Sequence, residues 1–265
     1  MSRFDEIQGV MAMAVLDPNV LNYYQLLSPG VASGLAAVVT AISVALALLI
    51  SRSFFRSYTF AGFGYLLGLP VGFAFLGASY LFELASVLFM SHPILHPAFF
   101  WIQMLLQAEA FALIALSYYY KNSAGDRRSH VSRDVAITIL PLLMVAVPFI
   151  APTSVLIAQP YFNYTGFADM SFFMRLFDII VIGYIFKSTV VSLVKAANLR
   201  LLYVPAAFAL LWLEQYSLVI AYFDNSTVAF VGSALARIAG LAAFAYVMHR
   251  IFNRRIVEIE ARKAT

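Results

Sequence analysis

Long apolar stretches dominate this sequence and set the strongest limit on its fold. Seven of them reach the length of about 20 helical residues that crosses a hydrocarbon core of about 30 Å. They cover residues 30–51, 57–90, 97–120, 135–158, 171–195, 200–223 and 227–251. The second stretch is over-long, and Pro70 near its centre predicts a kinked helix. With 63% hydrophobic and 11% charged residues, the chain is expected to be an all-α, polytopic membrane protein with seven transmembrane helices.

Basic residues lie in alternate connections between these stretches, which predicts the orientation of the chain. Of the 17 lysines and arginines, the following gather on one side: Arg52, Arg56, Lys121, Arg127, Arg128, Arg133, Lys195, Arg200, Arg250, Arg254, Arg255, Arg262 and Lys263. The intervening connections contain no lysine or arginine. The positive-inside rule therefore places the N-terminus outside and the C-terminus inside. The basic balance indicates contact with anionic lipid rather than with nucleic acid.

Three regions follow from this pattern. Residues 1–29 form an outer N-terminal segment that does not have the pattern of a cleaved signal peptide. Residues 30–251 form the transmembrane bundle, and residues 252–265 form a short basic cytoplasmic tail.

Ionisable side chains inside the apolar stretches are the strongest indication of a site. Such groups are costly in hydrocarbon and face the bundle interior, paired with each other or with water. The spans contain four carboxylates and three bases, namely Glu83, Glu109, Asp178 and Glu214, and Arg175, Lys187 and Arg237. At least one acid is therefore expected to be protonated or bound to a cation. Arg175 and Lys187 are close enough to the span ends to reach the interface, and Arg175 is also spaced to pair with Asp178. We predict a polar outer-half pocket lined by Glu83, Gln103, Gln107, Glu109, Asp178, Glu214, Gln215 and Arg237. The alternative is a set of purely structural ion pairs.

The two ends of the chain resemble each other at an offset of about 130 residues, as in seven-helix folds built from two three-helix repeats. YLFELASVL, starting at residue 80, aligns with LWLEQYSLV, starting at residue 211, and this matches Glu83 to Glu214. AEAFALIALSY, starting at residue 108, aligns with ARIAGLAAFAY, starting at residue 236, and this matches Glu109 to Arg237. If the repeat holds, Glu109 and Arg237 occupy equivalent places near a pseudo-axis, and we predict that they pair.

Small residues repeat every fourth position in three of the stretches, a pattern typical of close helix packing. The predicted seams are Gly30 and Gly34, then Gly64, Gly68 and Gly72, and finally Gly232, Ala236 and Gly240.

Other chemistry is weakly represented. The absence of cysteine excludes disulfides and thiolate sites, and no Gly-rich phosphate loop, HExxH or GxSxG motif is present, so an enzyme is not expected. His92 and His96 are four residues apart, but prolines interrupt that helix, so no metal site is predicted. Asn163 and Asn225 fit the N-glycosylation pattern on the outer side.

The run ALARIAGLAAFAYVMHR, together with LLWLEQY, resembles the last helices of the microbial rhodopsins, which also have seven helices with the N-terminus outside. The lysine that holds retinal in that family would fall at or beside Arg237, and arginine cannot form the Schiff base. No cofactor is therefore expected, retinal included.

The runs FLGASYLFELASVLF and FFWIQMLLQAEAFALIALSYYY are similar to the seven-helix sensor modules at the N-terminus of many archaeal and bacterial histidine kinases. This resemblance covers about sixty residues and implies a prokaryotic cell membrane. In that family the module is joined to a cytoplasmic kinase, whereas this sequence ends at RRIVEIEARKAT, so output would pass to a separate signalling partner.

Three functions remain open at this point. The first is a sensor or receptor in which a small ligand or a proton binds the polar pocket and is read at the basic inner face. The second is a proton-coupled or small-solute transporter, which the possible repeat favours. The third is a structural subunit of a membrane complex.

Overall fold

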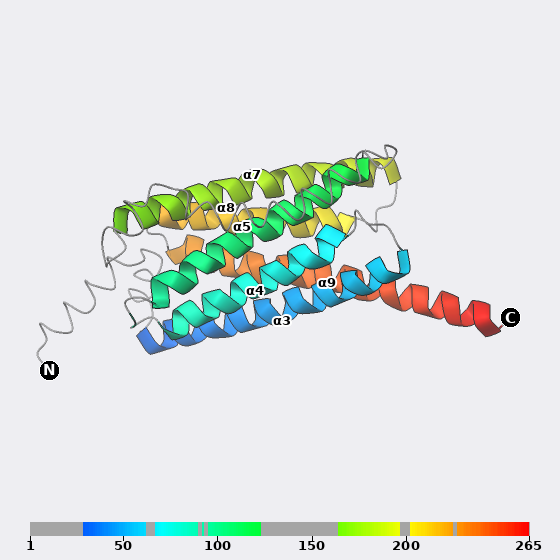
Figure 1. Ribbon diagram of the computed structural model, residues 1–265, viewed down its shortest axis with the longest axis horizontal. Helices are drawn as coiled ribbons and strands as arrows, with labels where there is room; N and C mark the ends of the chain where they lie inside the picture. Colours follow the sequence, from blue (N-terminus) through cyan, green and yellow to red (C-terminus); the bar gives the residue numbers. More distant parts are fainter. Residues whose placement is uncertain are drawn as a thin grey trace, which may run out of the picture.

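The structure, a computed structural model, describes residues 29–61, 67–89, 92, 95–122, 164–196, 202–224 and 227–264. Nearly all of these residues are helical (Figure 1). The helices are α3 (Pro29–Ala61), α4 (Gly68–Leu88), α5 (Leu95–Asn122), α7 (Tyr164–Ala196), α8 (Tyr203–Asp224) and α9 (Thr227–Ala264). The described part of the chain is therefore all-α, as the apolar stretches predict.

All six helices are long and apolar enough to cross a membrane. The candidate spans are Ala36–Arg56, Gly68–Leu88, Ala98–Tyr119, Phe172–Lys195, Tyr203–Ala221 and Val228–Arg250. Many large apolar side chains on their outer faces are exposed, as expected for surfaces that face lipid. The chain is a multi-pass membrane protein. The predicted helix at 135–158 lies outside the described residues, as do residues 1–28.

The six helices form a closed ring in the order of the sequence. Each packs against the next one described, and α3 packs against α9 to close the ring. In Figure 1, α3, α5, α7 and α9 run in one direction, and α4 and α8 run in the other. We call the end where α9 begins the N-terminal end of the bundle, and the end where α9 leaves it the C-terminal end. The halves α3–α5 and α7–α9 thus have the same internal order of packing.

The first two helices differ from the prediction. Residues 57–61 belong to α3, and α4 begins at Gly68. Pro70 therefore lies in the first turn of α4 and not at the centre of a kinked helix. A first-turn proline costs no helical hydrogen bond, because the N–H groups of that turn have no intrahelical acceptor. The Pro70 carbonyl accepts a 2.7 Å hydrogen bond from the Ser51 hydroxyl, which joins α4 to α3.

The predicted small-residue seams hold in part. A Cβ added at Gly72 would lie 2.6 Å from the Ile114 side chain of α5, and one added at Gly77 would lie 2.9 Å from Leu48 of α3. Around Gly34 and Gly232, in contrast, no described atom lies within 4 Å of such a Cβ. Close packing therefore depends on glycine along α4, whereas Gly34 and Gly232 have no close neighbour within the described helices.

The core between the halves is aromatic. Phe73 of α4, Phe208 of α8 and Phe244 of α9 are buried, and the Phe244 ring makes edge contacts with both of the others at centroid distances of 5.2 and 4.7 Å. α9 continues as a helix to Ala264, beyond the tail boundary expected at residue 252, and its end projects from the bundle (Figure 1).

Candidate functional site

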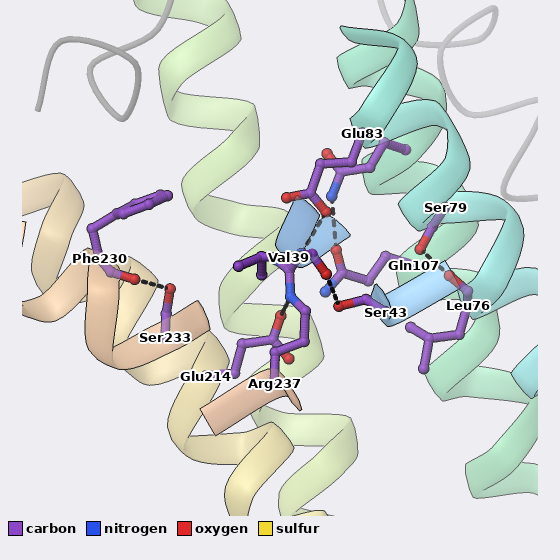
Figure 2. A network of polar contacts seen from close by, with 11 residues as sticks. Val39, Ser43, Leu76, Ser79, Glu83, Gln107, Glu214, Phe230, Ser233 and Arg237 are labelled. Carbon is purple, nitrogen blue, oxygen red and sulfur yellow. Dashed lines mark hydrogen bonds and ion pairs between the residues drawn. The ribbon is translucent and has the colours of Figure 1, made fainter. Parts of the chain in front are cut away.

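Arg237 lies between two carboxylates from different helices. Its Nε donates to Glu214 Oε1 and its Nη1 donates to Glu83 Oε2, each at 2.7 Å. Figure 2 shows the Arg237 side chain, which comes from α9, directed between Glu83 of α4 and Glu214 of α8. The Glu214 side chain is fully buried, and the Glu83 side chain keeps 23% of its surface exposed. An arginine in an apolar helix is therefore neutralised from two sides.

The helical register of each element brings these groups inward. On α8, the buried residues that share a face with Glu214 are Ala207, Leu211 and Leu218, at the spacing of one helix face. On α9, Gly240 allows close approach, because a Cβ there would lie 3.1 Å from the Ala207 carbonyl. Arg237 therefore starts close to α8, and its long side chain reaches α4 across the interior.

A tyrosine that the sequence analysis did not select completes this cluster. The Arg237 guanidinium carbon lies 4.8 Å from the centroid of the Tyr80 ring, a cation–π distance. Tyr80 is fully buried and precedes Glu83 by three residues, so both occupy one face of α4. The three-residue spacing from Glu83 could have indicated Tyr80. Tyrosine is uncharged, however, and nothing else in the sequence distinguishes Tyr80 from the other 14 tyrosines.

Asp178 and Arg175 of α7 join the same electrostatic network. Both are buried, and Asp178 lies within electrostatic reach of Arg175, Glu214 and Tyr80. Their electrostatic interaction supports the intrahelical pair expected from the spacing of three residues. Lys187 is exposed, in agreement with the reading that it extends away from the interior. We define the Arg237 cluster as Tyr80, Glu83, Arg175, Asp178, Glu214 and Arg237.

The predicted pair of Glu109 and Arg237 is wrong. Within the described part of the chain, neither Glu109 oxygen has a hydrogen-bond partner, although the residue is buried. The reason lies in the order of the ring: α5 packs against α4 and α7, whereas α9 packs against α8 and α3. The match of Glu83 to Glu214 identified two residues that do meet, because both hold the same arginine.

Gln103, Gln107 and Gln215 are buried as well. Gln103 Nε2 donates to Gln107 Oε1 at 2.9 Å, one turn along α5. Several buried side-chain atoms in the described residues have no hydrogen-bond partner: Tyr80 Oη, Gln103 Oε1, Gln107 Nε2, both Glu109 oxygens, Asp178 Oδ1, Glu214 Oε2 and both amide atoms of Gln215. Such a concentration is unusual, because buried polar atoms are nearly always satisfied.

The eight predicted pocket residues share a depth range in the bundle. Measured from the end of its span that lies at the N-terminal end of the bundle, each is five to eleven residues deep, or about 8 to 17 Å along the helix axis. Glu109 is the deepest, at mid-span, and Glu83 is among the shallowest. Glu83 is also partly exposed, whereas Asp178 and Glu214 are buried.

The histidine pair does not form a metal site in the described structure. His96 Nδ1 lies 2.9 Å from both the hydroxyl and the carbonyl oxygen of Ser86, which ties the start of α5 to the end of α4. His92 Nδ1 accepts a 3.2 Å hydrogen bond from the Leu95 backbone at the start of α5. Among the described residues, no three His, Cys, Asp or Glu side chains are placed to hold a metal ion. The patterns at Asn163 and Asn225 lie outside the described residues.

Comparison of the chain with protein families, with curated proteins and with solved structures finds no match. Its functional assignment therefore rests on the geometry of the six helices and their polar interior.

Proposed function

We propose that this protein is a membrane sensor of the receptor type. In this proposal a small ligand or a proton binds the polar interior near the N-terminal end, and the signal leaves through α9 to a separate cytoplasmic partner. The observation that carries the proposal is the continuity of α9. The same helix holds Arg237 in the polar cluster and continues to Ala264 beyond the bundle. A change in the contacts of Arg237 would shift or rotate a rigid element that extends to the opposite end.

The proposed topology has seven transmembrane helices with the N-terminus outside, in the cell membrane of a prokaryote. Its support is the direction of α5 and α7, which run in parallel (Figure 1). α5 ends at the C-terminal end of the bundle and α7 begins at the N-terminal end. A membrane crossing by the apolar stretch at 135–158 would join these two ends, and this is the seventh helix of the proposal. The basic C-terminal segment then lies in the cytoplasm, where a signalling protein can read it.

A small-solute or proton-coupled transporter is the second candidate. It is favoured by the equivalent packing of α3–α5 and α7–α9, because transporters commonly place their sites between two repeats. Glu83 and Glu214, which the repeat makes equivalent, both contact Arg237 at the boundary between the halves. In a transporter, this site would open alternately to the two sides of the membrane. In a sensor, it would signal that a ligand is bound.

A test of the sensor proposal uses the absence of cysteine in the chain. Spin labels at Arg52→Cys of α3 and Ala261→Cys of α9 report the position of the projecting helix in nanodiscs. Glu83→Gln loosens one of the two contacts of Arg237 and leaves the buried Glu214 contact intact. We expect this variant to shift the distance distribution between the labels. The control Lys187→Gln removes an exposed charge outside the cluster and leaves the distribution unchanged.

The competing functions give different results. If Glu83→Gln leaves the label distances as they are in the parent chain, α9 does not transmit the state of the cluster and the sensor proposal fails. If liposomes that contain the protein show proton or solute flux that Glu214→Gln abolishes, the protein is a transporter.

A further inference from the structure

Three buried oxygens in the Arg237 cluster have no hydrogen-bond donor among the residues that the structure describes. They are Tyr80 Oη of α4, Asp178 Oδ1 of α7 and Glu214 Oε2 of α8. Tyr80 and Glu214 are fully buried, and Asp178 is 3% exposed. A buried polar atom without a hydrogen-bond partner destabilises the folded state. Three of them in one cluster indicate a place where a donor group from outside the chain is accommodated.

The three oxygens belong to one electrostatic environment. Tyr80 lies within reach of Glu214 and Asp178, and Asp178 lies within reach of Glu214. Arg237 occupies only one oxygen of Glu214, so the other carboxylate oxygen remains available. The Tyr80 hydroxyl differs from the two carboxylates because it carries no charge. It is fully buried and has no hydrogen-bond partner in the described helices.

The charge of the cluster sets the charge of the guest. With all three carboxyl groups ionised, Glu83, Asp178 and Glu214 would set three negative charges against the two positive charges of Arg175 and Arg237. The excess of one negative charge is strongly unfavourable in a medium of low dielectric constant. A guest with a single positive charge neutralises the cluster.

The arrangement of the acceptors distinguishes between kinds of cation. No three carboxylate or histidine side chains in the described structure are grouped tightly enough for a metal ion. The three free oxygens come from three different helices, so the guest has to reach separate acceptors. An alkylammonium group provides one positive charge and three N–H donors and no acceptor, which complements three oxygens at a net charge of minus one.

We infer that the Arg237 cluster binds a small organic ammonium ion, with Tyr80, Asp178 and Glu214 as its acceptors. This inference rests on the proposed function, because it names the ligand class for the same interior site. Glu83, the partly exposed carboxylate of the cluster, is the side on which a guest can enter.

The test compares monocations that differ in their N–H donors. The protein in nanodiscs is titrated with methylammonium, tetramethylammonium or sodium chloride at constant ionic strength and pH, and tryptophan fluorescence follows both binding and thermal unfolding. We expect methylammonium to bind saturably and to raise the unfolding temperature. Tetramethylammonium has the same charge and no N–H donor, so it and sodium should have no such effect.

Two substitutions locate the site. Tyr80→Phe removes one hydroxyl and keeps the ring beneath Arg237, so it should fold normally and weaken methylammonium binding by about tenfold. Tyr184→Phe, at an exposed tyrosine of α7, is the matched control and should leave the affinity unchanged. Equal responses to all three salts, or equal affinities of the two variants, would overturn the inference.

The result also separates this inference from the proposed function. Saturable methylammonium binding without a shift of the α9 label distances would support the ligand class and refute the sensor. A shift of those distances in Glu83→Gln without methylammonium binding would support the sensor and refute the ligand class.

Discussion

Removal of the Arg237 guanidinium is the perturbation with the largest expected effect. Arg237→Met keeps the length and apolar character of the stem and leaves Glu83 and Glu214 facing the space between them. Both carboxylates are now 2.7 Å from nitrogens of one guanidinium. Without the arginine, two charges roughly 6 Å apart repel each other by about 3 kcal/mol at an effective dielectric constant of 20.

Loss of the two charge-assisted hydrogen bonds adds to this repulsion, while protonation of one carboxylate and water near the partly exposed Glu83 relieve part of it. Removal of one partner from a buried ion pair typically costs about 3 to 5 kcal/mol. We expect Arg237→Met to lower the free energy of unfolding by that amount. The measurement is reversible unfolding in mixed detergent micelles, followed by tryptophan fluorescence.

The combined variants separate charge from packing. Replacement of all three residues by Arg237→Met, Glu83→Gln and Glu214→Gln removes every charge and should recover most of the lost free energy. Arg250→Gln is the matched control, because Arg250 is exposed at the end of the α9 span, and it should change stability by less than about 0.5 kcal/mol.

Two results would refute the reasoning. If Arg237→Met were as stable as Arg250→Gln, the two ion pairs would contribute nothing to the fold. If the triple variant were as unstable as Arg237→Met alone, the loss would come from packing of the side chain and not from the unpaired carboxylates.

Three further predictions use the same unfolding measurement. Gly72→Ala should destabilise the protein by about 1 to 3 kcal/mol, because the added methyl group would meet an α5 side chain at 2.6 Å. The control Gly232→Ala, where no described atom lies near the added methyl group, should be neutral or slightly stabilising. Equal effects of the two substitutions would show that α4 and α5 do not need this contact. Glu109→Gln should leave stability unchanged or raise it, because neither carboxylate oxygen is hydrogen-bonded, and a loss above about 1 kcal/mol would reveal a partner. Ser86→Ala removes the hydroxyl 2.9 Å from His96 Nδ1 and should cost about 1 kcal/mol, and no loss would mean that the Ser86 carbonyl alone holds the ring.

The boundaries of the helices show how far local sequence information reaches. The spans at α5, α8 and α9 were predicted within a few residues at their starts, because a run of apolar residues is a local property. The junction of α3 and α4 was misplaced, since Pro70 is compatible with a kink or with a first turn. The choice between them depends on where the chain turns back against α3, which the local pattern does not encode.

The glycine repeats illustrate the same limit. Gly72 and Gly232 both belong to four-residue repeats, yet only Gly72 has a neighbouring helix against its surface. A small residue permits two helices to approach closely, but the sequence does not show which small residues face a neighbouring helix. The missed role of Tyr80 is similar, because its hydroxyl becomes significant only when Arg237 and Asp178 arrive from other helices.

The sequence by itself determined that this chain crosses a membrane, that its interior carries a polar cluster in one half of the bundle, and that Arg237 requires carboxylate partners. These conclusions follow from hydrophobicity, helix periodicity and the cost of charge in hydrocarbon, which are properties of each helix alone. Only the tertiary structure decided that the partners are Glu83 and Glu214 and that Glu109 pairs with no side chain in the described helices. The pairing depends on the order of the helices in the ring and on the reach of the side chains, and both are set by how separate helices pack.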